Sequence, residues 1–201
     1  MATPDLVLDL ARSRRSARRH ASAPVPEAAI ACILEAARWA PSAANRQPWH
    51  FVVVGDSDLK QALRRAFLAE ADGRGVKYRS VTEKQADLLL SPGLILVCGD
   101  PGTKARYVNA DEIGGPVQEE LFLLSMGAAI QTMLLAATAC GLTSTWIARP
   151  ARLEAVRALL NVPAALRAIA FVALGVAAAP PQWTEQMRNP IKRHENRFGG
   201  P

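Results

Sequence analysis

The chain has 201 residues, of which 50% are hydrophobic and 21% are charged. These proportions are typical of a globular protein with a sizeable core, and they exclude a disordered or fibrous chain. The formal net charge is +6, and a basic excess attracts phosphate, whether on a nucleic acid, a membrane surface or a cofactor.

The first third of the chain predicts two helices, a strand and a third helix. A capping residue, a proline and an acid at residues 3–5 open the first helix. Apolar residues recur at helical spacing over residues 30–37, and Pro41 ends this second helix. The apolar run over residues 51–54 predicts a buried strand, and Ser57 or Asp58 should cap a helix that reaches about residue 70.

The middle of the chain predicts a loop, a helix, a strand and a long irregular segment before the longest helix. Residues 71–80 are glycine-rich and charged, which indicates a mobile loop. We expect a helix over residues 81–90, a buried strand over 93–98 and irregular structure over 100–116. The longest helix is expected over residues 117–140.

The last third predicts a brief strand over residues 144–148, a helix over 151–160 and a strong strand over 168–176. A polar arm over residues 181–201 then closes the chain. Because helices and strands are interspersed without repeats or a linker, we expect one α+β domain over residues 1–201.

Residues 121–148 contain no charged side chain, and this length is sufficient for a transmembrane helix. Polar residues interrupt the stretch, Gly141 offers a helix stop, and the flanks lack an aromatic belt. We therefore favour a helix buried on nearly all sides over a membrane span. The three cysteines are far apart and have no zinc-binding spacing, so we expect a cytoplasmic protein without a metal.

The first candidate site is a basic segment near the start of the chain, Arg14, Arg15, Ser16 and Arg18. On a helix, Arg14 and Arg18 would lie one turn apart on one face. Two guanidinium groups and a hydroxyl suit a phosphate dianion. The alternative is a solvated basic face or a loose nucleic-acid contact, although no aromatic residue is interleaved for base stacking.

The second candidate site is the loop between the second helix and the first strand, residues 40–50. It is dense in hydroxyl and amide groups and is held by two prolines. Such a loop presents hydrogen bonds to a planar heterocycle better than it packs a core. The alternative is a helix-terminating turn that places Trp49 in the core.

Four stretches, RRSAR, WAPSAANRQPWHFVVV, SMGAAIQTMLLAA followed by GLTSTWI, and FVALGVAAAPP, resemble the nitroreductase superfamily in order and spacing. The resemblance implies a central mixed β-sheet surrounded by helices, with the C-terminal arm extending over a partner subunit. It also implies a homodimer that binds FMN without covalent attachment at the subunit interface, with NAD(P)H as a transient electron donor.

The resemblance implies a role for each matching residue of the site. The basic segment resembles the binder of the phosphate and ribityl groups, and Arg188 resembles an arginine that returns to the phosphate. Residues of the loop resemble the part that reaches the flavin from the partner: Pro41, Ser42, Ala43, Asn45 and the supporting Gln47. Residues 144–149 resemble the run that binds the pyrimidine edge of the ring, and they include Thr145, Trp146 and Arg149.

Two positions depart from the family pattern. Many relatives have phenylalanine at the position of His20 and glycine near Arg149, so we expect Arg149 to favour anionic ligands. Residues 71–116 match poorly, and this region usually shapes the substrate pocket.

The resemblance implies reduction of nitroaromatics, quinones or similar planar electron-poor molecules by a ping-pong mechanism, in which the flavin and no protein residue carries the chemistry. Rival functions are dehydrogenation, dehalogenation or flavin fragmentation on the same scaffold. A non-enzymatic flavin-binding or nucleic-acid-binding protein is the more distant rival; we expect neither a nucleic-acid nor a membrane partner.

Overall fold

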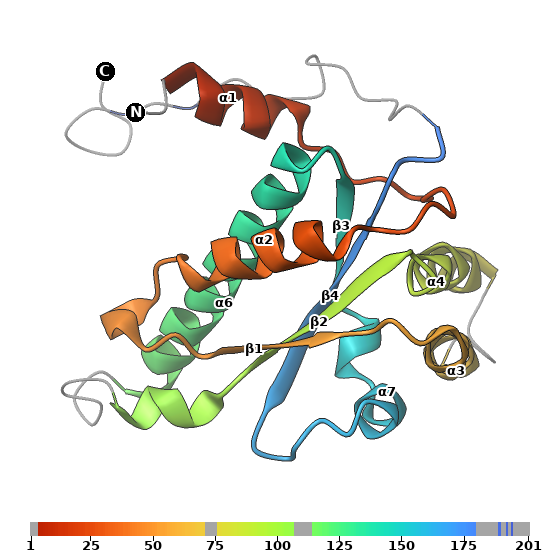
Figure 1. Ribbon diagram of the computed structural model, residues 1–201. Helices are drawn as coiled ribbons and strands as arrows, with labels where there is room; N and C mark the ends of the chain where they lie inside the picture. Colours follow the sequence, from red (N-terminus) through yellow and green to blue (C-terminus); the bar gives the residue numbers. More distant parts are fainter. Residues whose placement is uncertain are drawn as a thin grey trace.

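Four strands form one antiparallel sheet, and helices cover both of its faces (Figure 1). This computed structural model describes residues 4–70, 76–106 and 114–179, together with Asn189, Lys192 and His194. The strands are β1 (Trp49–Val53), β2 (Gly93–Gly99), β3 (Thr143–Ile147) and β4 (Arg167–Gly175). Their order in the sheet is β1-β2-β4-β3, so β1 and β3 are the two edges.

The expected mixed sheet is wrong for the described residues, because all three pairings are antiparallel. The physical reason lies in the connection between β1 and β2. Two helices, α3 (Ser57–Ala69) and α4 (Val76–Leu88), fill this connection and return the chain to the end at which β1 finished. β2 therefore starts beside the end of β1, with Val53 opposite Ile95.

The two faces of the sheet support two separate cores. Successive side chains of a strand point to opposite faces. Ile95 and Val97 therefore pack with α2 (Glu27–Arg38) and α6 (Gly115–Ala139), whereas Leu94 and Leu96 pack with α3, α4 and α7 (Glu154–Leu159). Every residue of β2 is buried, which explains the uninterrupted apolar run in its sequence. Each large side chain buried in this way stabilises the fold by about 1.5–3 kcal/mol.

Several helix boundaries differ from the sequence prediction: the helix expected over 117–140 spans 115–139, that expected over 151–160 spans 154–159, and residues 101–106 of the expected irregular segment form a 3-10 helix. Two further differences concern α3 and α4. Asp56, not Ser57 or Asp58, caps α3, since its carboxylate accepts a hydrogen bond of 2.7 Å from the amide of Leu59. Helix α4 begins at Val76, so residues 76–80, expected in a mobile loop, are helical. Packing of α4 against α3 supplies the stabilisation that the local composition lacks.

A buried lysine joins the α3 helix to the start of β2. The side chain of Lys60 is 7% exposed, and its ammonium donates hydrogen bonds of 2.8 and 2.9 Å to the carbonyls of Ser91 and Pro92. Burial lowers the pKa of Lys60 from its ordinary value. The two carbonyls satisfy the charge in place of water.

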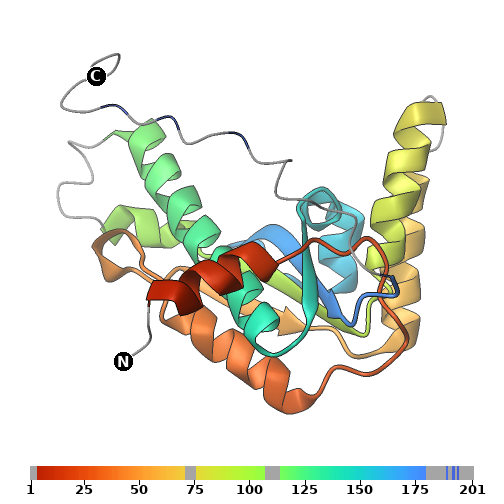
Figure 2. The same ribbon diagram turned by 90° about the horizontal axis from the view of Figure 1, so that it is seen from above.

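Helix α6 is the long apolar helix, but it is not buried on nearly all sides as expected. Leu124 is 70% exposed and Val117 is 45% exposed. By length and composition this helix is long and apolar enough to cross a membrane, a criterion that the core helices of soluble proteins also meet. Its C-terminal half contacts α1 (Pro4–Ser13), which also exposes leucines (Figure 2). The expected arm over residues 181–201 lies outside the described residues, apart from the three single positions.

Candidate functional site

The basic segment follows α1 and is held against the sheet in an extended conformation. Helix α1 ends at Ser13, whose hydroxyl donates to the carbonyl of Asp9. The hydroxyl of Thr145 donates a hydrogen bond to the carbonyl of Ala17, and the amide of Ala21 donates to Val176. The expected helical placement of Arg14 and Arg18 one turn apart is therefore wrong. In this segment, hydrogen bonds to β3 and to the residue after β4 take the place of the hydrogen bonds that a helix would form.

Two of the three cationic side chains at positions 14–18 have no carboxylate partner among the residues that the structure describes. Within the described ranges, neither Arg15 nor Arg18 forms an ion pair with a carboxylate. Arg18 is exposed and Arg15 is half-buried, while a guanidinium nitrogen of Arg14 lies 3.3 Å from the hydroxyl of Ser16. Several guanidinium groups and a hydroxyl in one short segment suit the oxygens of a phosphate group.

His20 supports the segment from the side of the sheet, a role that the sequence did not reveal. Its Nδ1 lies 2.8 Å from the hydroxyl of Ser91. The backbone of His20 also forms an isolated antiparallel β-bridge with Ala177. Burial lowers the pKa of His20, which favours the neutral ring. A Cβ at Gly175 would stand 2.8 Å from that of His20, so the close approach requires glycine.

The loop between α2 and β1 holds several residues in the left-handed region of φ. Ala44, Asn45 and Gln47 have φ of 49°, 53° and 48°. This region costs non-glycine residues free energy, and such backbones persist where the surroundings enforce them, often at binding sites.

Hydrogen bonds hold this loop in place. The hydroxyl of Ser42 accepts from the amide of Gln47 at 2.9 Å. The hydroxyl of Ser125 on α6 accepts from the amide of Ala43 at 3.0 Å. The side chains of Asn45 and Gln47 are joined by a further hydrogen bond of 3.1 Å and are exposed. Trp49 is half-buried and packs against the core. The two interpretations of this loop, a polar binding surface and a turn that places Trp49 in the core, are therefore compatible.

Residues 144–149 occupy edge strand β3 and the turn after it. Trp146 is 43% exposed. Strand β3 pairs with β4 on one side, and no strand of the described sheet pairs with its other side. The guanidinium of Arg149 lies 5.3 Å above the ring of Phe67 and 3.4 Å from the hydroxyl of the buried Thr82. Arg149 therefore reaches the α3 and α4 pair, a contact that the sequence did not indicate. Its role at a cofactor stays a prediction.

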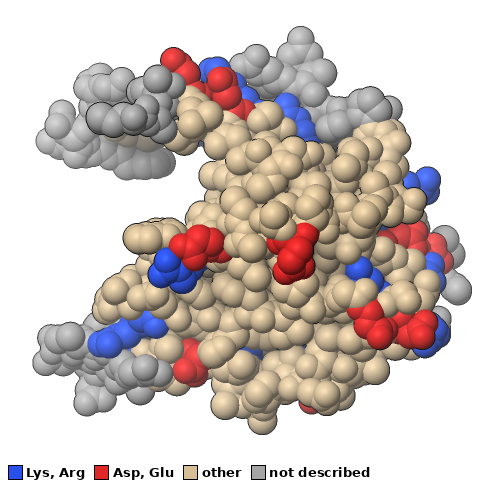
Figure 3. All heavy atoms as spheres, viewed as in Figure 1, with Lys and Arg blue, Asp and Glu red and all other residues tan. Residues whose placement is uncertain are grey.

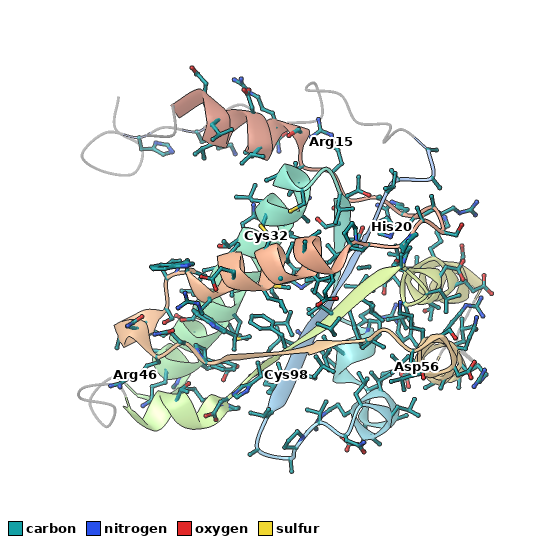
Figure 4. The ribbon with its side chains drawn as sticks, viewed as in Figure 1. Arg15, His20, Cys32, Arg46, Asp56 and Cys98 are labelled. Atoms are coloured by element: carbon teal, nitrogen blue, oxygen red, sulfur yellow. The ribbon has the colours of Figure 1, made fainter. Side chains whose placement is uncertain are left out.

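The structure brings some of the predicted site residues together and separates others. The basic segment and β3 are neighbours, because Thr145 bonds to Ala17. The loop lies at the other end of the subunit, as the positions of Arg15 and Arg46 show (Figure 4). Arg188 lies outside the described residues. One chain therefore presents two half-sites at opposite ends, which we name the phosphate half-site (residues 14–18 with β3) and the loop half-site (residues 41–47).

The donor set of the phosphate half-site fits FMN. Arg15 and Arg18, which form no ion pair within the described ranges, match a phosphate group, and an edge strand offers backbone groups to the polar edge of a ring. The exposed amides of Asn45 and Gln47 in the loop half-site add further donors and acceptors.

Comparison with known proteins identifies the class. The chain matches the Nitroreductase family over residues 11–176, and it therefore belongs to that family. A relative from Archaeoglobus fulgidus is 31% identical over 172 residues, covering 84% of this chain and 83% of the relative, and is named provisionally as an NADH dehydrogenase/NAD(P)H nitroreductase.

Two solved structures are similar over nearly the whole chain. A nitroreductase with bound FMN from Desulfitobacterium hafniense has a TM-score of 0.73 and 25% identity, over 96% of this chain and 100% of that one. Iodotyrosine deiodinase bound to FMN and 3-iodo-L-tyrosine has a TM-score of 0.71 and 27% identity, over the same shares. The predicted family and α+β fold class are confirmed. The two solved structures contain bound FMN, the predicted cofactor, and the name of the Archaeoglobus fulgidus relative includes NAD(P)H, the predicted electron donor.

Proposed function

We propose that the chain is an FMN-dependent oxidoreductase that uses NAD(P)H to reduce a nitroaromatic, a quinone or another planar electron-poor molecule. The observation that carries this proposal is the cationic segment fixed beside the edge strand β3, in which Arg15 and Arg18 form no ion pair within the described part of the chain. Family membership and the FMN-bound structures of relatives support it.

The working unit of the proposal is a homodimer with two flavin sites. The two half-sites lie at opposite ends of one chain, so a ligand that touches both must lie between two copies (Figure 4). In a twofold dimer, a contact from the first copy to the second is repeated from the second copy to the first. The loop half-site of each copy would therefore meet the phosphate half-site of the other, which completes two sites at once.

Exposed apolar side chains support the same arrangement. Trp39, Leu124 and Val7 are 74%, 70% and 59% exposed, respectively. Figure 3 shows a wide hollow between α1 and α2, with charged side chains on its rims. Exposed apolar surface of this kind marks protein contacts, and a second copy of the chain would cover it.

Residues of the chain would bind and orient the cofactor. Bound FMN supplies the electron-transfer chemistry. Arg15 and Arg18 would bind its phosphate through charge-assisted hydrogen bonds, and the backbone of β3 would align the polar edge of the ring. Asn45 from the partner's loop half-site would close the other side. A cleft between two chains admits one planar molecule at a time, so we expect the donor and acceptor to alternate in a ping-pong mechanism.

An absorbance spectrum of the purified protein, followed by anaerobic addition of NADH and NADPH, tests the proposal. We expect a flavin spectrum, release of a monophosphorylated flavin on acid precipitation, and bleaching by at least one nicotinamide. Colourless protein that does not take up added FMN would contradict the proposed cofactor. FMN-loaded protein that neither nicotinamide bleaches would contradict the donor.

A second candidate is reductive dehalogenation on the same scaffold. It is favoured by the similarity to iodotyrosine deiodinase with FMN and 3-iodo-L-tyrosine, which extends over 96% of this chain. Parallel assays with a nitroaromatic, menadione and a halogenated tyrosine distinguish the two candidates. Release of halide at a higher kcat/KM than nitro or quinone reduction would favour the second.

A further inference from the structure

A second hollow lies at the far end of β4 from the phosphate half-site. Its volume is about 350 Å³, and its lining includes Arg152, Arg157 and Arg167. Arg167 is the first residue of β4, whereas the phosphate half-site is tied to residues just beyond its last residue, Gly175. A strand of this length spans about 27 Å, at roughly 3.3 Å a residue. The two places are therefore too far apart to bind one phosphate group.

Two of these arginines are already partly committed to carboxylates. A guanidinium nitrogen of Arg157 lies 3.1 Å from Glu154, and Arg167 is paired with Glu119. Glu119 also accepts a hydrogen bond of 2.9 Å from Lys104. Hydrogen bonds from Arg167 and Lys104 lower the pKa of Glu119, which keeps this carboxylate charged.

The hollow nevertheless keeps unused hydrogen-bond donors. The side chain of Arg152 is exposed and has no hydrogen bond or ion pair among the described residues. The Nε of Arg157 is buried and has no partner there either, while another nitrogen of its guanidinium donates to the carbonyl of Leu166 at 3.3 Å. In the turn before β4, the amides of Ala164 and Ala165 donate no hydrogen bond to the described part of the chain. The lining of the hollow includes three arginines and, among the described residues, no carboxylate, so its wall is positively charged.

We infer that this hollow, lined by Arg152, Arg157 and the turn at Ala164–Ala165, is a binding site for a small oxyanion, such as the phosphate or carboxylate group of a metabolite. Guanidinium groups and free backbone amides are the donors that bind such groups. The two carboxylates nearby do not repel the ligand strongly, because each is already bound by a cation. The site is independent of the flavin, so it does not rest on the proposed function.

Calorimetric titration of the purified protein with inorganic phosphate, at constant ionic strength and with saturating FMN to fill the phosphate half-site, tests this inference. We expect saturable binding that Arg152→Ala weakens about tenfold, the effect of losing one charge-assisted contact. The matched control is Arg65→Ala, which removes the same charge from an exposed position on α3 and should leave the affinity unchanged.

Each alternative outcome overturns the inference. Citrate, titrated in parallel, tests the carboxylate, and the absence of saturable binding of both phosphate and citrate ends the proposal. Equal losses in Arg152→Ala and Arg65→Ala would indicate general charge attraction and no specific site. Because Arg152 is exposed, thermal denaturation should show that its variant folds normally.

Discussion

The two half-sites of this subunit are built by opposite means. The phosphate half-site is an extended segment whose conformation is set by hydrogen bonds to β3 and to residues after β4. The loop half-site is a tight turn with three left-handed residues, held by the hydroxyls of Ser42 and Ser125. The first half-site holds three arginines, whereas the second combines the exposed amides of Asn45 and Gln47 with one arginine, Arg46.

The difference indicates a division of labour between the two ends of the chain. The guanidinium groups of Arg15 and Arg18 supply affinity for a charged group, and a rigid turn with two exposed amides supplies orientation. If two copies join these ends, affinity and orientation come from different subunits. Binding of FMN and association of the chain are then thermodynamically linked.

The largest effect is expected from a change that keeps the half-sites apart. Leu124→Glu places a charge on the exposed apolar face of α6. An unpaired charge buried in an interface costs about 3–5 kcal/mol, so we expect a monomer with FMN affinity reduced at least ~100-fold. Sedimentation and FMN titration measure both. Val81→Glu, at a position 47% exposed on α4, is the matched control. A monomeric variant that still binds FMN tightly would end the shared-site proposal.

Reversing one charge tests the phosphate half-site alone. Arg18→Glu sets a negative charge against the phosphate, and loss of the charged hydrogen bond costs about 1.5–3 kcal/mol. We expect FMN affinity to fall by roughly 10–100-fold while the thermal midpoint of the apoprotein changes little, because Arg18 is exposed. Arg65→Glu on α3 should leave FMN binding as it is. Equal effects of the two variants would mean that the overall charge, and not this segment, attracts the cofactor.

Removal of one acceptor tests the loop half-site. Ser125→Ala leaves the amide of Ala43 without its partner on α6. A neutral hydrogen bond contributes about 0.5–1.5 kcal/mol, so FMN affinity should fall by roughly 2–10-fold. Thr132→Ala is the control, since its hydroxyl bonds only to the carbonyl of Ala128 in its own helix. If both variants bind FMN equally well, the hydrogen bond does not position the loop.

The smallest effect concerns pH and the histidine that supports the phosphate half-site. Burial lowers the pKa of His20 below its ordinary value of 6.5, so the unfolded chain binds the proton more readily. The stability contributed by the neutral ring is complete above 6.5 and is lost as pH falls below it. Urea denaturation at several pH values should show this slope in the parent and a flatter one in His20→Phe. His50→Gln, at an exposed position on β1, should keep the slope.

Much of the fold could be predicted because burial leaves a direct trace in the sequence. The run over residues 93–98 is apolar throughout, and β2 is buried on both faces. The start of α4 at Val76 could not be predicted, because packing against α3 outweighs the local glycine-rich composition. The direction of the strands likewise depends on how α3 and α4 return the chain, which no single segment encodes.

The candidate site could be predicted in its residues but not in its conformation. The composition around Arg14 is compatible with a helix, and the decisive hydrogen bond joins Thr145 to Ala17, 128 positions apart. Glycine would have signalled left-handed backbone in the loop, but Ala44 and Gln47 adopt it without that signal. The resemblance to the family identified the loop and the basic segment because their residue types match. The contact of Arg149 with Phe67 depends on packing that such motifs do not encode.

The buried lysine between α3 and β2 makes the chain suitable for chemical labelling. An amine that is 7% exposed and bound to two carbonyls is protected from acylating reagents, in contrast to an amine in water. Acylation of Lys60 therefore requires the α3 helix to separate from the start of β2, and its rate measures how often this separation occurs. A slow rate that increases in mild denaturant, before the whole chain unfolds, would reveal local opening of the α3 and α4 pair.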